Sequence, residues 1–238
     1  MKKTWISTVV VIVAAAAVAF WVFFDRQRAP EAQIDTTLNA MPAWQVIKEP
    51  ALHQRILDQM AALQKAGEPE QQIIDTIQPQ ILHLQMSRLQ NAPDANVVNY
   101  MTINMEQTAA IQKVSDDACF RFLYPMVKGG VNPMRMLDKD LMTRRMQADA
   151  DMMRAAYGKN RHTVTQAERE AAAEDVRPVM KALADKYGED IQLLQMPEKA
   201  VGKEKLSCDM VQEMWAKVLA LPEQKAAGVI RLAVSELE

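Results

Sequence analysis

Residues 50–67 read PALHQRILDQMAALQKAG, and this stretch decides the fold class. Its large apolar side chains recur every three or four residues, at Leu52, Ile56, Met60 and Leu63. That interval places them on one face of an α-helix, because about 3.6 residues complete a helical turn. Gly67 suits the end of the helix, since glycine readily adopts the left-handed backbone found there. The stretch therefore predicts an amphipathic helix.

The same spacing recurs along the chain and predicts further helices. They are expected over residues 69–89, 94–111, 116–128, 136–157, 165–188, 207–218 and 222–237. Ser115, Thr165 and Ser207 can cap three of these helices through their hydroxyl groups. The chain has only 7 glycines and 5% aromatic residues, which disfavours sheets. We therefore predict an all-α protein, with an N-terminal transmembrane helix followed by a helical bundle or irregular helical array of about seven or eight helices.

The N-terminal segment has the properties of a membrane span. Residues 5–24 read WISTVVVIVAAAAVAFWVFF and carry no charge, a length that crosses a hydrocarbon core of ~30 Å. Trp5 stands at one end and Trp21 at the other, where aromatic rings favour the membrane interface. We interpret residues 5–24 as a transmembrane signal anchor. A cleaved signal peptide is the alternative, but cleavage after Ala19 would leave five apolar residues at a mature terminus in water.

The domain organisation follows from that anchor. Lys2 and Lys3 before the span are matched by Arg26 and Arg28 after it, so side-chain charge alone does not set the orientation. The positive α-amino group favours the N-terminus inside, and residues 1–4 are therefore interpreted as a cytoplasmic tip. Residues 25–49 lack a sustained helical periodicity and are interpreted as a tether. Residues 50–238 then form an all-helical extracytoplasmic domain. The expected location is the bacterial inner membrane, single-pass, with the N-terminus in the cytoplasm and the C-terminal domain in the periplasm.

The chain contains two cysteines, Cys119 and Cys208, each on a predicted helix among apolar residues. An even number of thiols in an oxidising compartment favours a disulfide between them. Two reduced core cysteines are the alternative, which a cytoplasmic domain would favour. Neither cysteine belongs to a CxxC motif, so thiol-disulfide catalysis is not predicted.

Charge and motifs argue against several functions. The formal net charge is -2, so no general basic field is available to hold nucleic acid. The sequence has no GxSxG elbow, no GxxxxGK[ST] loop and no GxGxxG following a strand, which removes the usual support for hydrolase and nucleotide-binding activities. We predict no catalytic residue, no metal ligand and no cofactor.

Several residues were weighed for chemistry and assigned structural roles. The chain has 17 methionines, and pairs such as Met152-Met153 resemble soft copper ligands, although helical spacing favours core packing. His53, His83 and His162 are scattered and fit no zinc motif. Asp149 and Asp151 form a DxD sequence that we interpret as a solvated helix face. Glu106 is a conceivable buried acid, but it is expected to face solvent or to pair locally. Residues 135–161 are locally basic and are interpreted as solvated.

The sequence thus favours a membrane-tethered periplasmic interaction protein, a scaffold, chaperone or inhibitor that binds another envelope protein through a helical surface. The anchor, the tether and the lack of a catalytic motif motivate this hypothesis. An envelope enzyme that cleaves glycans and a methionine-rich copper-binding protein are the alternatives. The former requires an acidic residue in a cleft, and the latter requires converging thioethers.

The predicted topology can be tested with a reporter enzyme fused after Glu238. A reporter that works only outside the cytoplasm should be active, because the anchor is expected to leave the C-terminus in the periplasm. Enzyme activity in whole cells is the measurement. Activity from a matched reporter that works only in the cytoplasm would contradict the topology.

Overall fold

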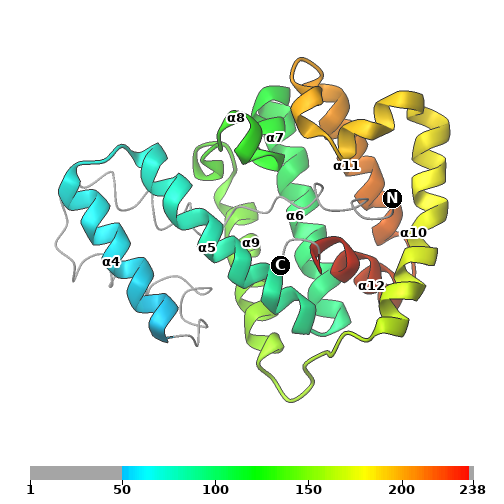
Figure 1. Ribbon diagram of the computed structural model, residues 1–238, viewed down its shortest axis with the longest axis horizontal. Helices are drawn as coiled ribbons and strands as arrows, with labels where there is room; N and C mark the ends of the chain where they lie inside the picture. The colour runs from blue at the N-terminus through cyan, green and yellow to red at the C-terminus, as the bar shows by residue number, and fades with distance from the viewer. Residues whose placement is uncertain (1–49, 236–238) are drawn as a thin grey trace.

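The computed structural model describes residues 50–235, in which every regular element is a helix (Figure 1). The α-helices are α4 (Pro50–Ala66), α5 (Glu70–Asn91), α6 (Asp94–Val114), α7 (Asp116–Leu123), α8 (Pro125–Lys128), α9 (Lys139–Ala156), α10 (Gln166–Tyr187), α11 (Glu204–Leu219) and α12 (Glu223–Val234). Three 3-10 helices, η1 (Pro133–Arg135), η2 (Gly188–Leu194) and η3 (Pro197–Ala200), lie between them. The predicted all-α class is therefore confirmed for these residues, which include no strand.

Helix α6 is the centre of the structure. It packs against α9, α7, α12 and α11, while α10 covers α12 and α11. Because helices surround α6, side chains on several of its faces are buried, including Val97, Tyr100 and Ile111. Helix α4 instead packs chiefly on α5, and the two form a hairpin that stands out at the left of Figure 1. The architecture is an irregular helical array with a projecting hairpin.

Capping residues predicted from the sequence mark the starts of α7 and α10. The Ser115 hydroxyl accepts a hydrogen bond from the Ala118 amide at the start of α7, and the Thr165 hydroxyl accepts one from Glu168 at the start of α10. Both are N-caps at expected positions. Ser207, in contrast, is buried inside α11, which begins at Glu204. The number of α-helices is nine in the described part because Pro125 opens a separate helix, α8, after Tyr124.

The predicted anchor and tether lie outside the described residues. Residues 1–4, 5–24 and 25–49 all precede α4, so the anchor, its orientation and the tether stay predictions. Within residues 50–235, no helix combines the length and apolar character needed to cross a membrane.

A fully buried ion pair lies within α9, and its arginine also contacts α6. The Arg145 guanidinium lies 2.9 Å from the Asp149 carboxylate, and both side chains have an exposed fraction of 0%. Arg145 also donates to the side-chain oxygen of Asn104 at 3.0 Å and stacks on the ring of Tyr100, 4.4 Å from its centroid. Burial raises the pKa of the Asp149 carboxyl, and the Arg145 charge opposes that rise. Interpreting Asp149 and Arg145 as solvated residues is therefore wrong.

Removing one member of this pair should be costly. We expect Arg145→Leu to lower the free energy of unfolding by about 3 to 5 kcal/mol, because it leaves a buried carboxylate without a partner. Asp149→Leu should cost more. In Arg145→Leu the unpaired Asp149 can take up a proton and become neutral, whereas in Asp149→Leu the unpaired Arg145 stays charged. The double variant Arg145→Met/Asp149→Leu should recover most of the loss. Urea unfolding of the full-length protein in detergent, followed by circular dichroism, measures these changes.

The control is the exposed ion pair between Arg154 and Asp151 on the same helix, at 2.7 Å with exposed fractions of 57% and 44%. Arg154→Leu should cost less than about 1 kcal/mol, because solvent screens such pairs. Equal losses for Arg145→Leu and Arg154→Leu would show that the buried pair has no special role.

Candidate interaction surface

A disulfide joins α7 to α11. Cys119 and Cys208 pair across a sequence separation of 89 residues, with their Cα atoms 6.3 Å apart. Both side chains are fully buried, beside apolar residues of both helices. This is the pairing that the sequence predicts. The described residues contain no other cysteine, so the bond is a structural link and not one half of a thiol relay.

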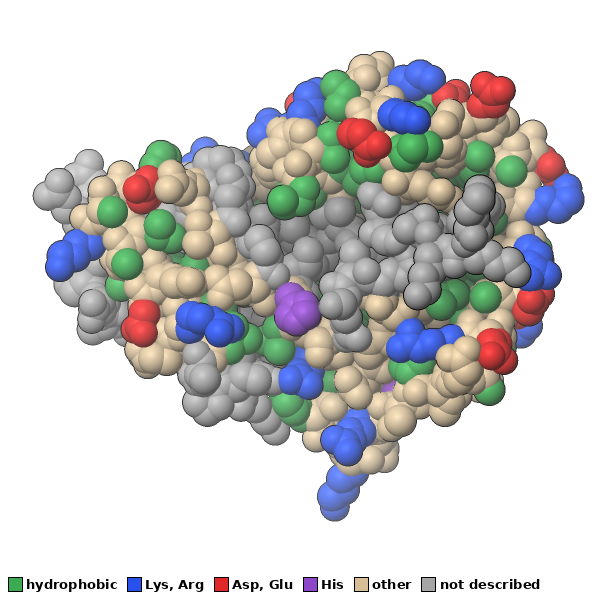
Figure 2. Space-filling model, viewed as in Figure 1, with side chains coloured by type: hydrophobic (Ala, Val, Ile, Leu, Met, Phe, Trp, Pro, Cys, Tyr) green, Lys and Arg blue, Asp and Glu red, His purple; other side chains and the backbone are tan. Residues whose placement is uncertain are grey.

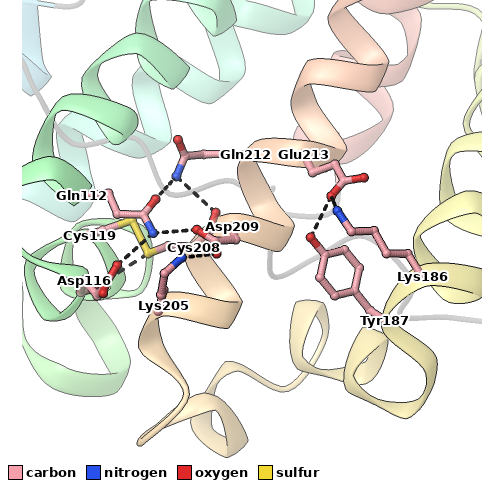
Figure 3. A network of polar contacts seen from close by, with 10 residues as sticks. All are labelled: Gln112, Asp116, Cys119, Lys186, Tyr187, Lys205, Cys208, Asp209, Gln212 and Glu213. Carbon is pink, nitrogen blue, oxygen red and sulfur yellow. Dashed lines mark hydrogen bonds and ion pairs between the residues drawn. A yellow bond between two sulfur atoms is a disulfide. The ribbon is translucent and has the colours of Figure 1, made fainter.

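A polar network covers this disulfide (Figure 3). The side-chain amide of Gln112, on α6, donates to Asp116 at 2.9 Å and to Asp209 at 2.8 Å. Gln212 in turn donates to the Gln112 oxygen, and Lys205 binds Asp209 at 2.5 Å. The network joins α6, α7 and α11 at the end where the disulfide lies. It therefore holds that end of the molecule in one arrangement.

A second cluster ties α10 to the other side of α11. The Lys186 ammonium donates a hydrogen bond to one carboxylate oxygen of Glu213, and the Tyr187 hydroxyl donates to the same oxygen at 2.7 Å (Figure 3). The hydrogen bond from Lys186, followed by that from Tyr187, lowers the pKa of Glu213. Helix α11 is thus fixed from both sides.

Lys128 forms an ion triplet with Asp117 and Glu204. Its ammonium lies 2.5 Å from Asp117 on α7 and 2.8 Å from Glu204 at the start of α11. The Lys128 hydrogen bond, together with backbone hydrogen bonds from Gly202 and from Glu204 itself, lowers the pKa of Glu204 to about 2. The triplet brings α7, α8 and α11 together at the end that contains the disulfide, at the top of Figure 1.

Three exposed large hydrophobic side chains lie close in sequence to members of this triplet. They are Val114, with an exposed fraction of 60%, Met126, with 90%, and Val201, with 52%. Each is two or three residues from a member of the triplet, a separation that spans at most about 11 Å of backbone. A shallow cleft of about 540 Å³ lies between the starts of α7 and α11, lined by residues that include Asp117 and Glu204. We call Val114, Met126, Val201 and this cleft the disulfide-end surface.

No family model, curated protein or solved structure matches this chain. The function must therefore be argued from the surfaces of the chain itself.

A second cleft, of about 650 Å³, lies between α10, α12 and the loop before α10. His162 contacts the Glu168 carboxylate at 2.6 Å, and the other oxygen of Glu168 meets the buried Arg231 guanidinium at 3.1 Å. Arg231 also binds Asp94 at 2.8 Å and donates to the carbonyl of Ala92 at 2.6 Å. Every one of these charges has a partner within the fold. The arrangement joins four segments of chain and does not resemble a nucleophile with its base.

The remaining residues weighed from sequence are separate in space and in role. Glu106 is exposed and pairs with Arg144 at 2.6 Å, as the local-pairing interpretation expected. Met152 and Met153 are buried in the core, also as the packing interpretation expected. Across residues 50–235, no three His, Cys, Asp or Glu side chains gather as metal ligands would.

Met126 is the feature that sequence reasoning missed. Tyr124 and Val127 are three residues apart and both pack against the core, whereas Met126, one of the two residues between them on this short turn, faces outward. The Pro125 helix start was the available signal, since it fixes this turn. Surface charge carries no comparable signal, because acidic and basic side chains are interspersed on the face seen in Figure 2.

The ion triplet predicts a pH dependence. Because the pKa of Glu204 falls from its ordinary value of 4.5 to about 2 on folding, its stabilising effect is complete above pH 4.5 and is lost as the pH falls towards 2. Glu204→Gln should therefore remove about 1 kcal/mol of the acid-induced loss of stability, a modest effect because solvent reaches Lys128. Urea unfolding at pH 6 and pH 3 measures it.

The matched control is Glu198→Gln, which changes an exposed carboxylate on η3. This variant should lose as much stability on acidification as the unmodified protein does. If Glu204→Gln behaves in the same way as Glu198→Gln, the triplet does not stabilise the fold.

Proposed function

We propose that this protein is a membrane-tethered interaction protein of the bacterial periplasm, which binds another envelope protein through the disulfide-end surface. Residues 5–24 hold it in the inner membrane, and residues 25–49 act as the tether. It works as a scaffold, chaperone or inhibitor. The partner recognised by this surface carries an apolar side chain that packs on Met126, flanked by charged groups that meet the ion triplet.

The observation that carries the proposal is the exposure of Met126. Its exposed fraction of 90% stands against 6% or less for the buried methionines Met60, Met86, Met101, Met142, Met152, Met153, Met210 and Met214. A thioether in water gains nothing for the fold, whereas a methionine at an interface adapts its three rotatable bonds to a partner. Val114 and Val201 are further exposed apolar side chains, each three residues from a member of the ion triplet. A group of exposed hydrophobic side chains with charged neighbours is typical of protein interfaces.

The rigidity of the surroundings supports the same assignment. A disulfide, a polar network and an ion triplet fix α7, α8 and α11 relative to one another. A surface that is already ordered loses less entropy when a partner binds. The disulfide also supports the periplasmic location, because such bonds persist in oxidising compartments.

A photoreactive amino acid placed at position 126 of the full-length protein tests the proposal. Irradiation of the native envelope should yield one discrete adduct, whose partner is identified by mass spectrometry. In the Met126→Asp variant the photoreactive amino acid is placed at position 114 instead. The yield of the adduct should fall by about tenfold or more, because burying a charge in an apolar contact carries a desolvation cost.

Ala173→Asp is the matched control, because it adds the same charge on an exposed position of α10. This variant should leave the adduct unchanged. Absence of any adduct from positions 126 and 114, or the same loss for Ala173→Asp as for Met126→Asp, would contradict the assignment of the disulfide-end surface.

A further inference from the structure

Met126 differs chemically from the other methionines as well as in position. Oxidation of a thioether requires the oxidant to reach sulfur, so susceptibility follows exposure. Met126 is 90% exposed, whereas Met101 and Met210 have exposed fractions of 0%. A small oxidant therefore meets the Met126 sulfur at the surface but reaches the core sulfurs only when the chain opens. The fold therefore favours mild oxidation at Met126 over these buried methionines.

We propose that Met126 is a reversible oxidation site, at which a hydroperoxide converts the thioether to a sulfoxide and thereby weakens partner binding. The effect on binding rests on the proposed function of the disulfide-end surface. The sulfur lone pair attacks one peroxide oxygen, and the O–O bond breaks. Sulfur loses two electrons as it binds this oxygen, whose proton is then transferred through solvent to the departing hydroxide, giving the sulfoxide and water. Hydrogen peroxide is the oxidant in the simplest case.

The local structure lets this change occur without loss of the fold. Sulfoxide formation adds a polar oxygen, which disrupts a methionine packed in a core. Met126 projects from α8 while its neighbour Val127 packs against the core, so the added oxygen lies in water. Arg121 also holds the following turn, by donating to the carbonyls of Gly129 at 3.2 Å and Gly130 at 2.8 Å. The modification therefore changes the surface and leaves its frame in place.

The consequence for binding follows from polarity. The thioether of Met126 is the most exposed apolar group at the disulfide-end surface, and its removal from water contributes to affinity. A sulfoxide keeps the shape of the side chain but must give up hydrogen bonds with water before it is buried. Enzymes that reduce methionine sulfoxide restore the thioether, so the change is reversible.

The first experiment measures the chemistry alone. The full-length protein in detergent is treated with hydrogen peroxide for increasing times, quenched and digested, and the sulfoxide fraction of each methionine peptide is measured by mass spectrometry. Met126 should be oxidised about tenfold or more faster than Met101 and Met210, a ratio that unfolding in urea should abolish. The melting temperature should not change while only Met126 is modified. Equal rates for Met126 and Met101 in the folded protein would overturn the proposal.

The second experiment measures binding through the adduct formed from position 114. Peroxide treatment should lower the adduct yield, and methionine sulfoxide reductase should restore it. Met126→Leu is the matched variant, because it keeps an apolar side chain of similar size without sulfur, and it should retain binding after peroxide treatment.

The outcomes separate this proposal from the proposed function. If Met126→Asp abolishes the adduct but oxidation at Met126 leaves it unchanged, the oxidation switch is overturned while the binding surface stands. If neither change affects the adduct, both are overturned. If peroxide lowers the adduct yield of Met126→Leu as much as that of the unmodified protein, the sensitive sulfur is a different one and the proposal is wrong.

Discussion

The burial of Arg145 and Asp149 constrains how α9 lies on α6. Burying two charges costs several kcal/mol unless their remaining polar groups find partners, and in the observed register Asn104 and Tyr100 on α6 supply these contacts to Arg145. Apolar side chains tolerate small shifts of one helix along another, whereas a charge with fixed partners does not. Helix α6 also supports α7, α11 and α12. The position of the disulfide-end surface therefore depends on polar contacts that lie elsewhere on the same helix.

The helices could be predicted because their signals are local. Apolar spacing identifies a helical face, and hydroxyl residues such as Ser115 and Thr165 satisfy free amides at the first turn. Burial of a polar residue is not local. Asp149 follows Ala148 in a helix with many charges, which is typical of a solvated face, yet α9 packs against both α5 and α6. A helix covered on two sides buries residues that its amphipathic pattern assigns to water, and only the tertiary arrangement reveals this.

The candidate surface could be predicted only in part, for a related reason. The chain has two cysteines, which can pair with each other in only one way, so the disulfide between α7 and α11 could be predicted from the cysteine count. The triplet of Lys128, Asp117 and Glu204 joins residues far apart in sequence, and charged residues are too common for such a partnership to be recognised. Methionine at helical spacing usually belongs to a core. Met126 departs from that rule because α8 is a single short turn. That turn packs on the core through Val127 and leaves Met126 in solvent.

Rigidity and adaptability are combined at the disulfide-end surface in a way that bears on binding. The covalent link, the Gln112 network and the ion triplet restrict the backbone of α7, α8 and α11, so in the proposed complex their ordering would precede binding. Met126 retains its side-chain freedom and would adjust to the proposed partner. An exposed side chain that was both rigid and apolar would fit one partner and would also promote self-association. One flexible thioether limits the apolar area that is exposed to water. Met126 lies on α8, whose Lys128 is held to α7 and α11 by the ion triplet.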